Sequence, residues 1–463
     1  MVGKTTVTAA TIALDRFGLG ARPDEAPPAD PKRSVLDQIE RLGAKPAAFD
    51  TTRSSPEIAT QYAAELQKLL GSDKADNLEA RKALREEIQA LYRAEVEARA
   101  LAALDTNTPF MERLVYFWSN HFAVSANKPR VTALAGAFER EAIRPFVLGR
   151  FNDMLLAVEH HPAMLFFLDR VGSIGPNSQA AQRAEAGDTR RKLGINENLA
   201  REIMELHTLG ARSGYNQSDV TEFALALTGW STGRIGEAVP NHAPGVFVFR
   251  PALHEPGSRR ILGKTYSQPG EGQAESVLQD LATHPATANH IGTKLARHFV
   301  ADTPLQPVVE RLSTTFSDTG GDLPSVYRAL IDLPEAWTSQ PAKFKTPWDW
   351  TISALRGIGR RDLDGINVAP LLNQLGQPVW RPGSPAGYDD TAASWAAPDA
   401  LVRRVEVAER IAATSPSDVD PRELARKLFP DSLSEPTAGE IDRADSARTG
   451  LALLLVSPEF QRR

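Results

Sequence analysis

Hydrophobic positions recur every three or four residues along most of this chain, which is the spacing of an amphipathic helix. In residues 31–43 (PKRSVLDQIERLG), Val35, Ile39 and Leu42 fall on one face and the segment ends in glycine. Residues 73–105 predict one long, highly charged helix with a narrow apolar stripe. Further helices are predicted near residues 108–123, 129–148, 150–169, 196–209, 218–229, 272–283, 286–300, 305–317, 323–332, 342–358, 397–412 and 444–457.

Three stretches break the helical pattern. Residues 172–192 are small and polar and predict a surface loop. Residues 375–396 are too rich in proline and glycine for regular structure. Residues 245–266 predict a β-hairpin: they alternate through Val248, turn at HEPGS and return through Ile261.

The predicted fold class is therefore mostly α, a large multi-helix domain with one small β-hairpin insertion. We expect residues 1–463 to form a single domain. If the chain divides, the division falls near 172–192, between an N-terminal helical part (1–171) and a C-terminal helical part that carries the hairpin (193–463).

Composition narrows the function classes. Of the 463 residues 42% are hydrophobic and 24% charged, and the net charge of −5 argues against a general nucleic-acid binder. No apolar run approaches the roughly 20 residues that span a bilayer, so no transmembrane segment is predicted. Cysteine is absent, which excludes disulfides and thiolate sites. The start of the chain lacks the apolar core of a signal peptide, which predicts a cytoplasmic location for the sequence as given.

Residues 196–209 (NENLAREIMELHTL) carry the first group of candidate functional side chains. On a helix, Asn198, Glu202 and Glu205 form one stripe at i, i+4 and i+7, beside an apolar arc. Two carboxylates one turn apart suit an acid/base pair or a helical site for a divalent metal. The alternative is structural, because both glutamates would equally serve in half-buried salt bridges with basic residues of other helices.

The segment WSNHF (118–122) is the second candidate. His121 follows Trp118 on the apolar side of its helix, which is typical of a core histidine. Asn120 and His121 also adjoin an aromatic cluster that includes Trp118 and would floor a ligand pocket. Both interpretations stay open.

Four further residues are candidate functional residues because of their positions alone. His254 lies in the turn of the predicted hairpin, a good place for a substrate-facing group or for a solvated side chain. Lys343 and Lys345 precede a helix that begins with proline, where they would neutralise an anionic ligand or remain solvated. His298 shares a face with Leu295, which indicates core packing. No G-x-S-x-G elbow, P-loop or dinucleotide fingerprint occurs.

Several blocks together resemble a known family. NENLAREIMELHTLG (196–210) followed by GYNQSDVTEFALALTGW (214–230) is similar to the signature of the bacterial family catalogued as domain of unknown function number eighteen hundred. Its other blocks are matched, in the same order, by RLVYFWSNHFAVS, HPAMLFFLD, FRPALHEPGSRRILGKTY, KLARHFV, TGGDLPSVYRALIDLPEAW, KFKTP and GQPVWRPGSPAGY. The resemblance covers the chain from about residue 13 to residue 460.

The resemblance implies no particular reaction. It implies that members are often exported, to the periplasm or beyond, and that their genes often neighbour those of sulfatase-like proteins, which makes such a protein a candidate partner. Two hypotheses follow. In the first, the protein is an enzyme, a hydrolase of a polar or anionic substrate that works with or without a bound metal. Glu202, Glu205, His121 and His254 would then be catalytic or hold a divalent metal, and Asn120, Asn198, Trp118, Lys343 and Lys345 would bind substrate. In the second, it is a non-catalytic binding or scaffold protein that acts with the partner.

Overall fold

A computed structural model describes residues 7–41, 45–70, 74–186, 194–233, 244–340, 343–416 and 419–463. These residues contain 22 α-helices and only two small pairs of antiparallel strands, which confirms the mostly α fold class. Among them no helix combines the length and apolar character that crossing a bilayer requires.

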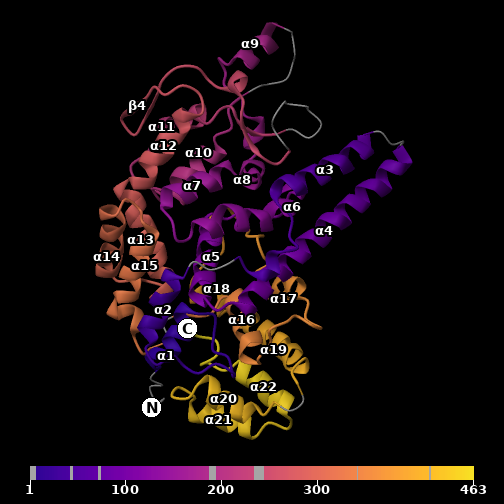
Figure 1. The fold of residues 1–463 in the computed structure, drawn as a ribbon, viewed down its shortest axis with the longest axis vertical. Coiled ribbons are helices and arrows are strands. Elements are labelled where there is room, and N and C mark those ends of the chain that lie inside the picture. Colours follow the sequence, from indigo (N-terminus) through magenta and orange to yellow (C-terminus); the bar gives the residue numbers. More distant parts are fainter. Residues whose placement is uncertain are drawn as a thin grey trace.

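The N-terminal half supplies the long helices of the molecule (Figure 1). Its helices are α1 (Ala9–Ile12), α2 (Pro31–Glu40), α3 (Ser55–Leu70), α4 (Lys74–Asp105), α5 (Pro109–His121), α6 (Pro129–Phe138), α7 (Phe151–His160), α8 (Pro162–Phe167), α9 (Gln179–Ala186), α10 (Asn198–Glu202) and α11 (Gln217–Ala226). Helix α4 confirms the long charged helix predicted over 73–105. It packs against α3, and the two project together from the body of the protein.

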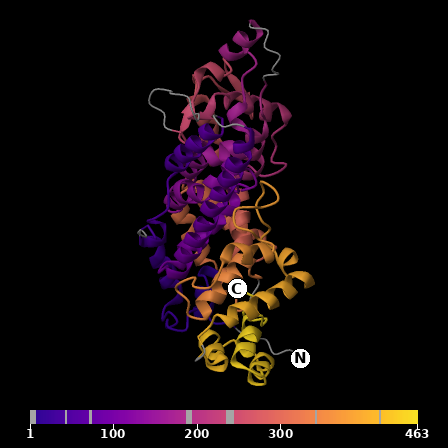
Figure 2. The same cartoon turned by 90° about the vertical axis from the view of Figure 1, so that its right-hand side faces the viewer.

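The C-terminal half packs around the same body and ends in a group of short helices (Figure 2). Its helices are α12 (Gly272–Thr283), α13 (Pro285–Phe299), α14 (Gln306–Asp318), α15 (Leu323–Asp332), α16 (Pro347–Gly357), α17 (Val368–Gln374), α18 (Ala392–Trp395), α19 (Pro398–Ala413), α20 (Pro421–Leu428), α21 (Glu435–Asp442) and α22 (Ala447–Leu455). One hydrophobic cluster reaches from Ile12 to Phe460, so it contains residues from both sides of segment 172–192.

The strands lie in the predicted region but pair differently. The strands are β1 (Trp230–Thr232), β2 (Phe247–Phe249), β3 (Arg259–Ile261) and β4 (Lys264–Tyr266). Val248 pairs with Ser231, not with the strand through Ile261, because a turn of 3-10 helix begins at Pro251 and ends β2. The small hairpin is β3–β4, whose two turn residues, Leu262 and Gly263, have φ of 49° and 79°. Positive φ at both positions is the geometry of a type I′ turn, which matches the twist of the paired strands.

The predicted loop at 172–192 is partly helical, because α9 occupies residues 179–186. The sequence there, QAAQRAEA, contains good helix formers and no glycine or proline, which favours a helix despite its small apolar area. Residues 187–192 of the predicted loop lie outside the described part of the chain. Segment 375–396 is irregular as predicted, apart from the short α18.

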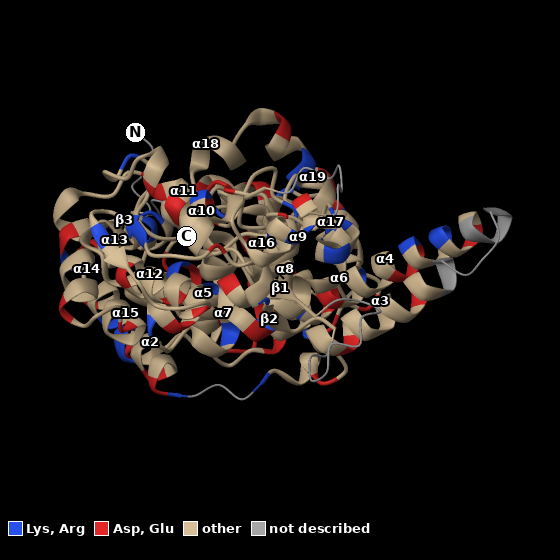
Figure 3. Ribbon diagram, turned by 90° about the horizontal axis from the view of Figure 1, so that it is seen from above, with Lys and Arg blue, Asp and Glu red and all other residues tan. Residues whose placement is uncertain are grey.

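Acidic and basic residues are interspersed over the elements, as the colours of the ribbon in Figure 3 show. This distribution fits the small net charge of −5. The clusters of charged side chains that bear on function lie in the interior and at cavities.

Candidate functional site

A cavity of about 480 Å³ is formed by α5, by one face of α13, by the start of α16 and by the irregular segment 377–390. A volume in this range suits a small organic ligand. Aromatic side chains form much of its wall, and polar side chains come from all four elements. The cavity therefore combines apolar contact area with a limited set of polar groups, as ligand sites do.

Helix α13 gives the cavity a basic stripe. Pro285 begins this helix, where its missing N–H costs no helical hydrogen bond. His290, Lys294 and His298 then follow at intervals of four residues, so they lie along one face, and all three line the cavity together with Arg297. The opposite side of α13 is apolar and packs into the core, which fixes the stripe in place.

His298 forms a hydrogen bond with Asp390, and the Nδ1 atom lies 2.5 Å from Oδ2. Because a carboxylate can only accept, Nδ1 carries the proton and Nε2 carries the lone pair. Among the described residues Nε2 has no hydrogen-bond partner; the atom is itself buried, although other atoms of His298 line the cavity. Burial lowers the pKa of His298 to about 4, although the charge of Asp390 opposes that shift. At neutral pH His298 is therefore an uncharged imidazole with a free, proton-accepting nitrogen.

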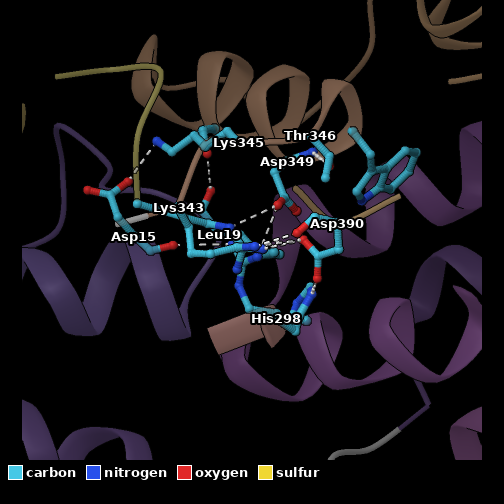
Figure 4. A network of polar contacts seen from close by, with 12 residues as sticks. Asp15, Leu19, His298, Lys343, Lys345, Thr346, Asp349 and Asp390 are labelled. Carbon is cyan, nitrogen blue, oxygen red and sulfur yellow. Dashed lines mark hydrogen bonds and ion pairs between the residues drawn. The ribbon is translucent and has the colours of Figure 1, made fainter. Parts of the chain in front are cut away.

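Buried cations hold the other oxygen of Asp390 (Figure 4). Its Oδ1 lies 3.5 Å from Lys343 Nζ and 3.5 Å from Arg463 Nη2. Lys343 Nζ also lies 2.5 Å from Oδ1 of Asp302. Burial raises the pKa of Asp390, but the contacts with His298, Lys343 and Arg463 outweigh burial and bring the pKa below its ordinary value. Asp390 is therefore ionised and fixed in orientation.

Asp349 is the second buried acid at the cavity, and it too is neutralised by buried cations. Its Oδ2 lies 3.2 Å from Arg113 Nη1 and 3.3 Å from Arg463 Nε. Burial raises the pKa of Asp349, and the charges of Arg113 and Arg463 outweigh it, so the pKa lies well below its usual range. Thr346 caps α16 by accepting the backbone N–H of Asp349, which places this carboxylate at the first turn of the helix.

Arg99, from α4, enters the cavity wall between aromatic rings. Its guanidinium carbon lies 4.1 Å from the ring centre of Trp348 and 4.3 Å from that of Tyr116. Its Nε lies 3.0 Å from each carboxylate oxygen of Glu139, which in turn accepts a hydrogen bond from Trp380. Neither Nη atom has a hydrogen-bond partner in the described part of the chain. The fork of this guanidinium is therefore free to contact a ligand.

Two cations of α13 have no ion pair with any described residue: Lys294 and Arg297. Burial lowers the pKa of Lys294 to about 8; the charge of Asp390 opposes this shift, and the charge of Arg297 adds to it. The acids Asp349 and Asp390 are already paired with cations of their own. Asp389 also lines the cavity and has no ion pair with a described residue, so it offsets part of this positive charge. The balance of unpaired charge in the cavity is positive, which favours an anionic ligand.

The predicted carboxylates lie away from this cavity. Glu202 is half-buried and has neither a hydrogen bond nor a salt bridge with the described residues. Burial, and then the charge of Glu205, raises the pKa of Glu202, which the nearby His207 opposes. Glu205 lies near the hydroxyl of Tyr215, whose pKa is raised by burial and then by the charge of Glu205. Asn198 is exposed, and its backbone N–H donates to the Asn196 side chain.

The predicted aromatic and imidazole groups occupy the core more than the cavity. Trp118 is fully buried and donates to Tyr327, at 2.7 Å. His121 is buried beside it, and its Nε2 contacts the carbonyl oxygen of His207 at 3.1 Å. His254 is half-buried, with Nδ1 2.8 Å from the carbonyl oxygen of Thr228. Neither His121 nor His254 lines the cavity.

Asn120 is the one residue of the nine predicted that lines the cavity. Its side chain holds segment 377–390 in place, because it donates to the carbonyl oxygen of Tyr388 and accepts from the Tyr388 N–H. Lys343 and Lys345 are not solvated, since both are buried in ion pairs. Lys345 Nζ lies 2.9 Å from Oδ1 of Asp15.

Sequence reasoning missed Arg99, Lys294, Arg297 and Asp390, and it placed His298 in the core without a partner. The sequence HIGTKLARHF contains the available signal, because basic side chains at i, i+4 and i+8 adjoin an apolar helix face. That pattern shows a basic stripe on α13. It does not show that Asp390, far along the chain, pairs with the last histidine of the stripe.

Potential metal ligands gather at a different place. Among the described residues one group of three His, Asp or Glu side chains has ligand atoms within 4.8 Å of one another: His160, Glu271 and Glu275. None of the three lines the cavity of α13. The acids predicted to hold a metal, Glu202 and Glu205, are not part of this group.

Fold and cavity together define a mostly α-helical protein whose described residues enclose a basic, aromatic-walled cavity. The chain belongs to the family described as "Protein of unknown function (DUF1800)", whose model matches residues 12–462, and this confirms the resemblance drawn from the sequence blocks. No curated protein and no solved structure matches the chain.

Proposed function

We propose that this protein is a hydrolytic enzyme that binds a small organic anion in the cavity of α13 and activates water with His298. The observation that carries the proposal is the pairing of His298 Nδ1 with Asp390, which leaves an unprotonated Nε2 without a partner. A histidine held in this way by a carboxylate is the arrangement of a general base. This proposal keeps the hydrolase predicted from the sequence but assigns its catalysis to different residues.

Charge supports an anionic substrate. Arg99, Lys294 and Arg297 line the cavity and have positive nitrogen atoms without a partner among the described residues. The planar fork of Arg99 suits a carboxylate, sulfate or phosphate group, which it would contact with two nitrogens. The rings of Tyr116 and Trp348 line the same cavity and offer contact area for an apolar or aromatic part of the substrate.

The proposed step is general-base hydrolysis. Nε2 of His298 takes a proton from water while the water oxygen bonds to the electrophilic atom of the ester. The bond to the leaving group then breaks, and the imidazolium returns the proton to the leaving oxygen. Asp390 stabilises the imidazolium that forms, and the buried cations Lys343 and Arg463 keep Asp390 ionised without contacting the substrate.

The test uses p-nitrophenyl phosphate, sulfate and acetate as probes for hydrolysis and for binding by calorimetry. We expect the charged esters to bind and at least one to be hydrolysed. Lys294→Met should weaken binding of the charged esters by about tenfold, since one charge-assisted contact is lost. His298→Gln should abolish turnover and leave binding in place. Arg311→Met, which removes an exposed charge on α14, is the matched control and should change neither.

The outcomes separate the two classes of function. Failure of both charged esters to bind the unaltered protein, or binding that Lys294→Met leaves unchanged, contradicts the anion site. Binding that depends on Lys294 but leads to no hydrolysis of any probe contradicts the enzyme. It would favour the second hypothesis, a non-catalytic binding protein that acts with a sulfatase-like partner.

A further inference from the structure

A second site lies where the end of α7 meets the start of α12. His160 is the last residue of α7, and Glu271 and Glu275 lie one helical turn apart at the beginning of α12. The two helices pack against each other, so the three side chains converge. All three are half-buried, and their ligand atoms lie within 4.8 Å of one another. The group is therefore converged, and each of the three residues is partly exposed.

The ring of His160 is held in a fixed orientation by the β1–β2 pair. It stacks on Phe247 with ring centres 3.9 Å apart, and its other contact is the edge of Trp230 at 4.4 Å. Nε2 is fully buried, has no hydrogen-bond partner among the described residues, and lies 4.0 Å from Oε1 of Glu275. Burial lowers the pKa of His160 to about 4, so at neutral pH the ring is uncharged, as a metal ligand must be.

The two carboxylates lack a compensating cation. Neither Glu271 nor Glu275 pairs with a lysine or arginine in the described part of the chain. Burial, and then the charge of Glu275, raises the pKa of Glu271. Two carboxylates that repel each other beside an unpartnered imidazole nitrogen are stabilised by a cation placed between them.

We propose that His160, Glu271 and Glu275 bind a divalent transition-metal ion of the Zn²⁺ class. One imidazole nitrogen and two carboxylate oxygens are donors that such ions accept, and water completes the coordination. Ligand atoms around a tetrahedral ion lie about 3.3 Å apart, which follows from metal–ligand distances of about 2.0–2.2 Å. The glutamates would therefore close in by about 1 Å through side-chain rotation, while the stacked His160 ring stays in place.

The proposal is tested on tag-free, full-length protein that has been dialysed against a chelator. Zn²⁺ is titrated by calorimetry, and Co²⁺ is added as a spectroscopic probe whose visible bands report the coordination. We expect one ion per chain. Glu271→Gln and Glu275→Gln should each weaken Zn²⁺ binding at least tenfold and change the Co²⁺ spectrum. Glu310→Gln, an exposed glutamate on α14, is the matched control and should leave both unchanged.

Thermal midpoints of the ion-free proteins show that the variants are folded, because neither glutamate side chain has a hydrogen bond with the described residues that glutamine would lose. The absence of saturable Zn²⁺ binding to the unaltered protein overturns the proposal. Binding that neither glutamine variant weakens also overturns it, since the ion would then lie elsewhere. His298→Gln provides a further check: it removes the proposed base of the α13 cavity and should leave Zn²⁺ binding unchanged, so the two proposals stand or fall separately.

Discussion

Nδ1 of His298 lies 2.5 Å from Oδ2 of Asp390, although 92 residues separate them in the chain. His298 belongs to a regular helix and Asp390 to an irregular segment rich in proline and glycine. The segment is held against α13 by Lys343, which contacts Asp390, and by Asn120, which brackets Tyr388. The orientation of the base is thus set by contacts that come from three distant parts of the sequence.

The first prediction concerns the protonation of His298. At pH 7 its ring should be neutral, with the proton on Nδ1, and it should not titrate until the pH approaches 4. Asp390→Asn should lower that pKa further, because the negative charge that favours the imidazolium is removed. Nitrogen-15 NMR of the imidazole, assigned by the signal lost in His298→Gln, measures both. Asp389→Asn, at the exposed neighbour, should leave the titration unchanged, and a proton on Nε2 would contradict the proposed base.

The second prediction concerns the pH range of anion binding. Lys294 has a pKa of about 8, so its ammonium is present below that pH and lost above it. Binding of p-nitrophenyl phosphate should therefore weaken as the pH rises through 8. Lys294→Arg should retain binding at pH 9, because a guanidinium keeps its charge there. Calorimetry at pH 7 and pH 9 decides the matter, and equal weakening of both proteins at pH 9 would show that another group titrates.

The helices were predictable because their signals are local. The spacing of Val35 and Ile39 and the proline-led starts of α2, α13 and α16 each fall within a few residues of the chain. Strand pairing is not local. Val248 pairs with Ser231 and not with the segment at Ile261. Hydrophobic alternation alone does not show which of these two segments the strand pairs with.

The site was less predictable than the fold, because its residues gain their roles from long-range contacts. The residues predicted from the sequence are those with a clear local pattern; Glu202, for example, lies beside an apolar helix face. The sequence favours solvated charges over ligand binding for Lys343 and Lys345, and only the fold shows that each is buried against an aspartate. His298 reads as a core histidine until Asp390 is placed beside it.

The third prediction concerns the stability of the Glu202→Gln variant. Burial raises its pKa, so its charged form is disfavoured in the folded protein. Glu202→Gln should therefore leave the thermal midpoint at pH 7 unchanged or raise it by about one degree. The gain should vanish as the pH falls and the carboxyl becomes protonated in both states. Glu310→Gln, at an exposed glutamate on α14, is the matched control and should leave the midpoint unchanged. A clear loss of stability in Glu202→Gln would point to a partner that this glutamate does not have among the described residues.

The last prediction tests whether Lys345 is structural. Its ammonium is buried 2.9 Å from Asp15 and lies over the ring of Phe460 at 4.7 Å. Lys345→Met would leave the Asp15 carboxylate buried without its cation, which should destabilise the protein by about 3–5 kcal/mol. The double variant Asp15→Asn/Lys345→Met should recover part of this loss, because the stranded charge is gone. Chemical denaturation measures both.

Lys264→Met is the matched control for that comparison. Lys264 also lies near an aspartate, Asp280, but its side chain is 60% exposed, so solvent screens the pair. Its loss should cost less than about 1 kcal/mol. The same proteins are then titrated with p-nitrophenyl phosphate. If Lys345→Met leaves stability intact but removes anion binding, Lys345 contacts the ligand, as one of the two interpretations of the sequence had it. If stability falls and the folded fraction still binds, Lys345 is structural through its ion pair with Asp15, which agrees with its absence from the cavity lining.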